Sequence, residues 1–261
     1  MPTTKEHLVG MFSKVMAGTV TREEGAMFLN FLARDNPSET ARELGDLISN
    51  PPAGMSAKTI LHTAAISRNR AFIAILVANL DSADEGIASL SAEELAGLRS
   101  AESRNALIEH LGNESDYTRR ACATALLRFD DGVDILKRHI LTHPDPLCRR
   151  TSVSVLVEAG KKGVECLLDV LNSDNSGAVA SSAQALVKSD LSDGDMARVF
   201  QALINAGDRG GDPCVITDLL KIAASLGRKA KGYEEYIMAF SDHPSEEVRN
   251  EASRTLIEIR A

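Results

Sequence analysis

The sequence predicts an all-α solenoid, in which helical hairpins stack on their nearest neighbours. Three observations predict this fold class. Apolar residues recur at helical spacing along nearly the whole chain, and no stretch shows the period-two alternation of a strand. Aromatic residues make up only 4% of the chain and Trp is absent, which suits a thin core between paired helices. From about residue 113 onward, the sequence repeats itself.

Residues 1–50 are expected to form an N-terminal helical cap. Apolar residues between positions 8 and 16 mark a first amphipathic helix, and Thr21 and Glu24 form a capping box that opens a second one. The predicted apolar residues of this second helix are Met27, Phe28, Phe31 and Leu32. A third helix starts at Pro37 and is stopped by the Pro- and Gly-containing residues 50–54.

Residues 51–112 are predicted to hold degenerate helical hairpins. The segments 57–67 and 69–80 keep the apolar spacing of helices, but they lack the Asp and Arg residues that recur further along the chain. We therefore expect these helices to pack like the later ones without sharing their polar pattern.

Residues 113–261 contain the regular repeats. The segments 118–126, 148–156 and 178–186 align without gaps, and each closes on a leucine 30 residues after the previous one. A fourth copy at 248–256 leaves room for two slightly longer units, with an intervening helix that begins at Asp212-Pro213. A single hairpin cannot bury its own apolar face, so stacked neighbours are expected to share a continuous core.

The repeat resembles a known family. The pattern Asp-x-x-x-Arg-x-x-(small)-x-x-x-Leu, read from Asp145 to Leu156, resembles the first helix of a HEAT repeat, and the 30-residue spacing is similar to the short repeats of phycobilin lyases. The resemblance covers residues 113–261, is weaker over 56–112 and is absent over 1–50. It implies a right-handed α-α superhelix of stacked HEAT-like helical hairpins. It says almost nothing about function, because the family serves many roles.

Charge and hydropathy exclude some classes of partner. The formal net charge of −8 argues against non-specific binding to nucleic acid, since an acidic chain repels polyanions. Only a short apolar stretch follows Lys5, which argues against a signal peptide. The longest apolar run, residues 71–78, is far shorter than the roughly 20 residues that a membrane-spanning helix needs. We expect a cytoplasmic protein that does not enter a membrane.

The four cysteines fit this expectation. They are Cys122, Cys148, Cys166 and Cys214. All lie in predicted helices without a CxxC motif or any paired spacing, so the sequence predicts buried, reduced thiols.

A row of arginines admits two interpretations. Arg119, Arg149 and Arg249 each stand seven residues before a closing leucine, and Val179 breaks the series. One interpretation is an anion-binding row. The other, which we favour, follows from the resemblance and is a structural ladder in which acidic residues cap the helices and pair with the arginines. Those acidic residues are Asp116, Asp145 and Asp242.

Uneven charge gives the main functional signal. Residues 117–162 carry nine basic and five acidic groups, whereas residues 81–116 carry two basic and nine acidic ones. A basic segment beside an acidic one suits a partner with complementary patches. The alternative is chance variation on a solvated surface. The candidate partner-binding residues are Arg120, Lys137, Arg138, Arg150, Lys161 and Lys162.

No motif predicts a catalytic residue, a cofactor or a metal site. His139 and His143 have the spacing of metal ligands, but no third ligand is evident. The acidic run 130–134 is too short for a calcium loop and is typical of a helix N-terminus. The Gly-rich segment 207–213 lacks the Lys-Ser/Thr of a phosphate-binding loop and is predicted to connect two helices. Neither G-x-S-x-G nor H-E-x-x-H occurs.

These observations favour a protein–protein interaction scaffold without catalysis. Its second helices would line a groove that binds another protein or peptide with an acidic patch. Two alternatives stay open through resemblance to other HEAT-like proteins. One is a phycobilin lyase-like or chaperone-like helper, and the other is a DNA-binding protein similar to alkylpurine glycosylases. The acidic net charge and the scarcity of rings oppose the second alternative.

Overall fold

The computed structural model describes residues 2–187, 189, 191–208 and 210–261. They divide into two compact units, Met1–Phe129 (unit 1) and Asp130–Ala261 (unit 2), and each is described by itself. The predicted fold class is confirmed: helices pair and stack in both units, and the described residues contain no strand. Within those same residues, no helix combines the length and the apolar character needed to cross a membrane.

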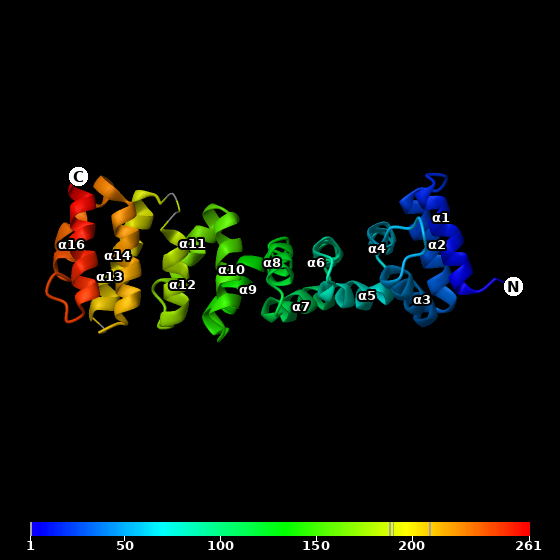
Figure 1. Ribbon diagram of the computed structural model, residues 1–261, viewed down its shortest axis with the longest axis horizontal. Helices are drawn as coiled ribbons and strands as arrows, with labels where there is room; N and C mark the ends of the chain where they lie inside the picture. Colours follow the sequence, from blue (N-terminus) through cyan, green and yellow to red (C-terminus); the bar gives the residue numbers. More distant parts are fainter. Residues whose placement is uncertain (1, 188, 190, 209) are drawn as a thin grey trace. The chain divides into compact units, whose positions relative to one another are not determined.

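Unit 1 is built of two layers of helices (Figure 1). Helices α2, α4, α6 and α8 pack on one another in chain order, helices α3, α5 and α7 form the second layer, and α1 covers α2 and α3. The bounds are α1 Thr4–Met16, α2 Arg22–Asp35, α3 Pro37–Ser49, α4 Ala57–Ile66, α5 Ile73–Ala78, α6 Glu85–Leu98, α7 Ala101–Glu109 and α8 Asp116–Leu126. Short 3-10 turns, Arg70–Phe72, Asn79–Asp81 and His110–Gly112, flank α5 and follow α7.

Helix starts in unit 1 follow the local sequence signals. The capping box at Thr21 is present as predicted: its side chain accepts the Glu24 N–H at 3.2 Å, and the Glu24 carboxylate accepts the Thr21 N–H at 2.8 Å. Pro37 occupies the first turn of α3, where a missing N–H costs nothing. These local contacts define where the two helices begin.

The predicted apolar face of α2 is wrong in part. Met27 and Phe31 are 72% and 55% exposed, and the helix buries Gly25, Ala26, Leu29 and Ala33 instead. The reason is close approach, since a Cβ on Gly25 would lie 3.1 Å from atoms of Met11 and Thr63. Neighbouring helices come nearest along the small-residue stripe of α2, which leaves the large side chains outside.

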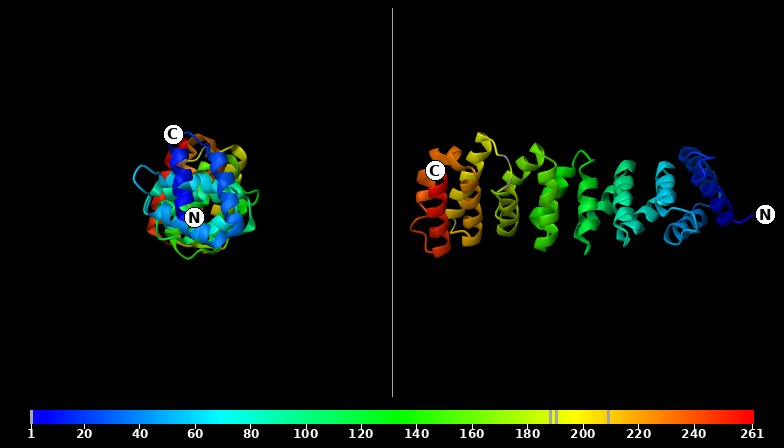
Figure 2. Two further views of the ribbon diagram at one scale, coloured as in Figure 1. Left: turned by 90° about the vertical axis from the view of Figure 1, so that its right-hand side faces the viewer. Right: turned by 45° about the horizontal axis from the view of Figure 1, so that its top comes forward.

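Unit 2 repeats the two-layer arrangement (Figures 1 and 2). Helices α10, α12, α14 and α16 form the first layer, α9, α11 and α13 form the second, and a 3-10 segment with α15 packs on α16. The bounds are α9 Gly132–Thr142, α10 Pro146–Glu158, α11 Lys161–Val170, α12 Ser176–Leu186, α13 Asp193–Asp208, α14 Pro213–Ser225, α15 Glu234–Met238 and α16 Glu246–Arg260. The 3-10 segment spans Gly227–Tyr233.

Two predicted helix starts in unit 2 are confirmed. Asp212 caps α14 and Pro213 opens it, as the repeat spacing required. The acidic run 130–134 is indeed a helix start, because α9 begins at Gly132. The Gly-rich segment 207–213 includes Arg209, which lies outside the described residues; α13 ends at Asp208 just before it.

The repeat leucines lie at the centre of the layers. Leu126, Leu156 and Leu186 are fully buried, whereas Leu256 in the last helix is half-buried. Helices of the two layers also approach closely, since a Cβ on Gly163 would lie 1.7 Å from the carbonyl oxygen of Leu156. The core is therefore thin, and small residues determine how close the layers come.

Candidate partner-binding surface

The repeated arginines fasten the turns that precede their helices. In each case Nη1 donates to the carbonyl groups six and five residues earlier in the chain. The contacts are Arg119 to Asn113 and Glu114 (2.8 and 2.9 Å), Arg149 to His143 and Pro144 (both 2.8 Å), and Arg249 to His243 and Pro244 (2.7 and 2.9 Å). Arg119 and Arg149 are only 7% and 8% exposed. A structural role for the row is therefore confirmed, but the arginines act by binding carbonyl groups, and of the predicted acidic partners Asp116 pairs with Arg119.

In the same three turns, the side chain of the first residue accepts a hydrogen bond from the backbone N–H two residues later. Asn113 Oδ1 accepts the N–H of Ser115 at 2.9 Å. His143 Nδ1 accepts the N–H of Asp145 at 3.2 Å, and His243 Nδ1 accepts that of Ser245 at 3.1 Å. Because Nδ1 accepts here, the ring proton of each neutral histidine resides on Nε2. His143 thus has a structural task.

The predicted acidic caps are right at one of three positions. Asp145 caps α10 by accepting the N–H of Leu147 at 2.9 Å. Asp116 is instead the first residue of α8, capped by Ser115, and its carboxylate pairs with Arg119 at 2.8 Å. Asp242 lies before Ser245, the N-cap residue of α16, and does not cap it. The acidic residue therefore stands at a different distance from the helix start in each turn.

His139 is positioned by hydrogen bonding and burial. Its Nδ1 lies 3.0 Å from the hydroxyl of Ser152, and its ring centre lies 4.6 Å from that of His143. Burial, and then the neighbouring His143, lower the pKa of His139 to about 4, so this ring is neutral at neutral pH. Across the described ranges, no group of three His, Cys, Asp or Glu side chains is placed to hold a metal ion.

Three of the four cysteines are buried, as predicted. Burial raises the pKa of Cys122 to about 12 and that of Cys166 to about 11, which makes both thiols unreactive at neutral pH. The prediction is wrong for Cys214, which is exposed. It is the second residue of α14 and lies outside the apolar stripe of that helix, beside Asp212, whose charge raises the pKa of Cys214.

A polar chain of side chains links the second-layer helices of unit 2. Lys137 on α9 donates to the carboxylate of Asp169 on α11 at 3.0 Å. Arg198 on α13 donates to the other oxygen of the same carboxylate and to the carbonyl oxygen of Glu165 at 2.9 Å. Sequence reasoning missed Asp169 and Arg198. Their only signal is separation by about one repeat, which many unrelated pairs share.

The remaining basic candidates of unit 2 fall on different layers. Arg138 is exposed on α9, and Lys161 and Lys162 are exposed in the first turn of α11. Lys161 is 90% exposed and lies 3.9 Å from Glu165. Within the described part of the chain, Arg138 and Lys162 form no ion pair. Arg150 is also exposed, but it belongs to α10 in the first layer.

Arg120 belongs to unit 1 and lines a surface hollow that includes none of the other basic candidates. The hollow encloses about 630 Å³ between α6 and α8, with Glu93, Tyr117 and Arg128 in its walls. Arg128 donates to the carbonyl oxygen of Glu93 at 3.1 Å and lies 3.7 Å from its carboxylate. This hollow is therefore lined by both signs of charge.

Comparison with known proteins identifies the repeat. The family model for HEAT repeats matches residues 73–156 and again residues 106–188. A search of curated protein sequences found no match. The polar and apolar patterns of the matched region are those described above for α5 to α12.

Several solved structures are distantly similar. Human deoxyhypusine hydroxylase in complex with glycerol is 14% identical, with a TM-score of 0.41, over 98% of this chain and 97% of that one. The complex of CpcE and CpcF of phycocyanin lyase from Nostoc sp. PCC7120 is 15% identical, with a TM-score of 0.32, over 99% and 95% of the two chains. An engineered protein is 18% identical, with a TM-score of 0.35, over 72% and 98%.

Proposed function

We propose that this chain, whose residues 73–188 are HEAT repeats, is a scaffold that binds a partner protein. The partner presents an acidic segment, and the segment lies on the second-layer helices α9 and α11 of unit 2. Arg138, Lys161 and Lys162 meet its carboxylates. Stacked helical repeats suit this task because their exposed side chains form an extended binding surface and can be substituted without affecting the buried core.

The availability of these three cations is the observation that supports the proposal. Lys137 and Arg198 already share the carboxylate of Asp169, so their charges are satisfied within the chain. Arg138 and Lys162 take part in no ion pair among the described residues. Lys161, which is 90% exposed, lies 3.9 Å from the exposed Glu165 and interacts electrostatically with Asp195. A carboxylate of the partner would thus gain charge-assisted hydrogen bonds from Arg138 and Lys162 without breaking an internal pair.

The expected contribution of these cations is to specificity and association rate. Exposed ion pairs each contribute about 0–1 kcal/mol, so three of them do not hold a complex alone. Complementary charge steers the encounter and disfavours wrong partners, and the remaining affinity comes from area buried beside it. Binding is therefore expected to weaken as salt concentration rises.

Charge reversal tests the proposal. The chain and its triple variant Arg138→Glu, Lys161→Glu and Lys162→Glu are each used to capture proteins from native cell extract, after circular dichroism has confirmed equal helicity. We expect a captured protein that the triple variant loses. The control is Arg150→Glu, which reverses an exposed charge on the first layer and should retain the partner. Capture of no protein, or equal capture by the triple variant, contradicts the proposal.

A further inference from the structure

The turn that precedes α12 lacks the arginine that binds the carbonyl groups of the sister turns before α8, α10 and α16. Val179 in α12 occupies the position of Arg119 in α8 and Arg149 in α10. By the same 30-residue spacing, Ser173 and Asp174 stand where His143 and Pro144 supply the carbonyl groups that bind Arg149. The turn therefore keeps the backbone positions of the arginine site but has an apolar, short side chain in place of the arginine.

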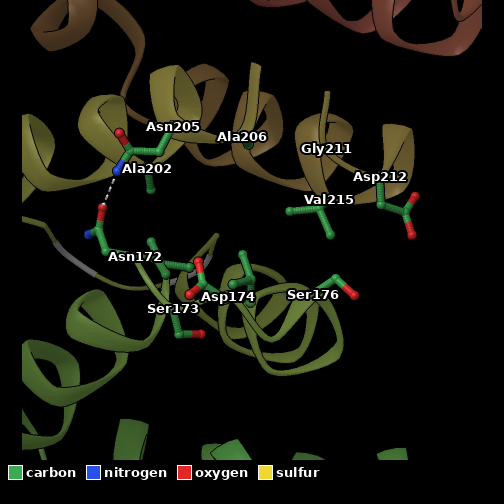
Figure 3. A pocket seen from close by; sticks show the side chains of 12 residues that line it. Asn172, Ser173, Asp174, Ser176, Ala202, Asn205, Ala206, Gly211, Asp212 and Val215 are labelled. Atoms are coloured by element: carbon green, nitrogen blue, oxygen red, sulfur yellow. Dashed lines mark hydrogen bonds between the residues drawn. The ribbon is translucent and has the colours of Figure 1, made fainter. Parts of the chain in front are cut away.

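A cavity of about 170 Å³ opens at this position (Figure 3). Ser173, Asp174, Ser176 and Val179 line it from the turn and from α12. The opposite side is formed by Ala202, Asn205 and Ala206 of α13, by Asp212, which caps α14, and by Val215 of α14. In Figure 3 the carboxylate of Asp174 points into the space between the two sides. The whole cavity lies within unit 2.

The lining residues match the partners of an arginine elsewhere in the chain. In the sister turn of α8, Arg119 binds the carbonyl oxygens of Asn113 and Glu114 and the carboxylate of Asp116. The equivalent positions here are Ser173, Asp174 and Ser176, and all three line the cavity. In the next turn, Arg149 reaches to within 2.7 Å of a Cβ built on Gly177 of α12. The guanidinium of Arg149 thus lies between the first-layer helices α10 and α12, and the cavity has the next two first-layer helices, α12 and α14, among its walls.

We propose that the cavity binds the guanidinium group of an arginine side chain donated by a partner polypeptide. The guanidinium offers several N–H donors in a planar fork, which fits adjacent carbonyl oxygens, and its charge is complemented by Asp174 and Asp212. The volume fits the head of one side chain, because pockets for drug-sized ligands enclose about 300–1,000 Å³. This site takes a cation and lies apart from the basic residues of α9 and α11, so it does not depend on the function proposed above.

Titration with model compounds tests the site on the full chain. The probe is N-acetyl-arginine amide, with N-acetyl-lysine amide and the uncharged isostere N-acetyl-citrulline amide as comparisons. Amide chemical shifts are followed by ¹⁵N NMR spectroscopy. We expect saturable shifts in residues 173–179 and at Val215, with the arginine compound binding roughly tenfold more tightly than citrulline because only its donors are charged. Absence of saturation, or equal affinities for all three compounds, overturns the proposal.

Two variants at one position separate occupancy from general disturbance. Val179→Arg should restore the contacts of the sister turns, abolish binding of the probe and raise the melting temperature. Val179→Met fills similar space without a donor, so it should also abolish binding but should not raise the melting temperature. Retention of the same saturable shifts by either folded variant would show that the probe binds elsewhere.

Discussion

At the scale of single residues, two adjacent arginines of α10 have different roles. The guanidinium of Arg149 is buried and fastens the turn before α10 through the carbonyl oxygens of His143 and Pro144. Arg150, one residue later, projects into solvent. A helical step of about 100° separates them, which is enough to move a charge from the interior to the surface. Position relative to the repeat, and not residue type, therefore decides what each arginine does.

This contrast gives a matched prediction. Arg149→Met keeps the apolar stem but leaves two carbonyl groups without their donor, so it should lower the free energy of unfolding by about 2–4 kcal/mol. Arg150→Met removes the same group from the surface and should change it by less than about 0.5 kcal/mol. Urea denaturation followed by circular dichroism measures both. Equal effects of the two substitutions would contradict the fastening role.

The sequence predicts some of these roles and not others. The seven-residue distance to the closing leucine groups Arg119, Arg149 and Arg249, and the resemblance to HEAT repeats favours a structural role for them over anion binding. Their acceptors are not predictable in the same way, because every residue carries a carbonyl group and none is marked in the sequence. The pairing of Lys137 with Asp169 depends on how adjacent repeats align, which periodicity within one helix does not specify.

At the scale of elements, close approach between layers sets the geometry of the repeat. Helix α11 begins directly after α10, and Gly163 in its first turn lies against the carbonyl oxygen of Leu156. A side chain at that position would have to push the two helices apart, and their buried leucines would separate with them. One glycine thus determines how tightly this pair of helices packs.

Alanine substitution at two glycines should have opposite effects. Gly163→Ala would place Cβ 1.7 Å from a backbone oxygen and should destabilise the protein by about 3 kcal/mol or more, because the helices must move. Gly45→Ala, in the interior of α3, meets no atom within 4 Å and should stabilise it by about 0.5–1 kcal/mol through helix propensity. Thermal unfolding of both variants measures the two changes in stability. Stabilisation by Gly163→Ala would show that the layers do not approach as described.

Helix locations followed from the sequence better than helix faces did. The caps at Thr21, Pro37 and Asp212 place helix starts because each satisfies or omits backbone donors locally. The exposed face of α2 was missed, since Met27 and Phe31 share a helical spacing that also fits a buried stripe. Local chemistry defines where a helix begins, whereas the neighbours decide which side it buries.

At the scale of the whole molecule, stability is expected to be regional. The chain divides into unit 1 and unit 2, and within each unit a helix packs on its nearest neighbours. In such arrays, the stability of a segment depends on its own units and on their nearest interfaces. Damage to one interface should therefore be felt most strongly close by.

Hydrogen exchange of two cavity variants tests this. Leu156→Ala in α10 and Leu61→Ala in α4 each remove a fully buried side chain and should cost about 2–5 kcal/mol locally. We expect the first to accelerate amide exchange in α9 to α12 while α2 to α4 keep their protection, and the second to do the reverse. Mass spectrometry of exchanged peptides resolves the two regions. If both variants deprotected both units to the same extent, the chain would unfold as one cooperative body, and the independence expected of stacked repeats would be wrong.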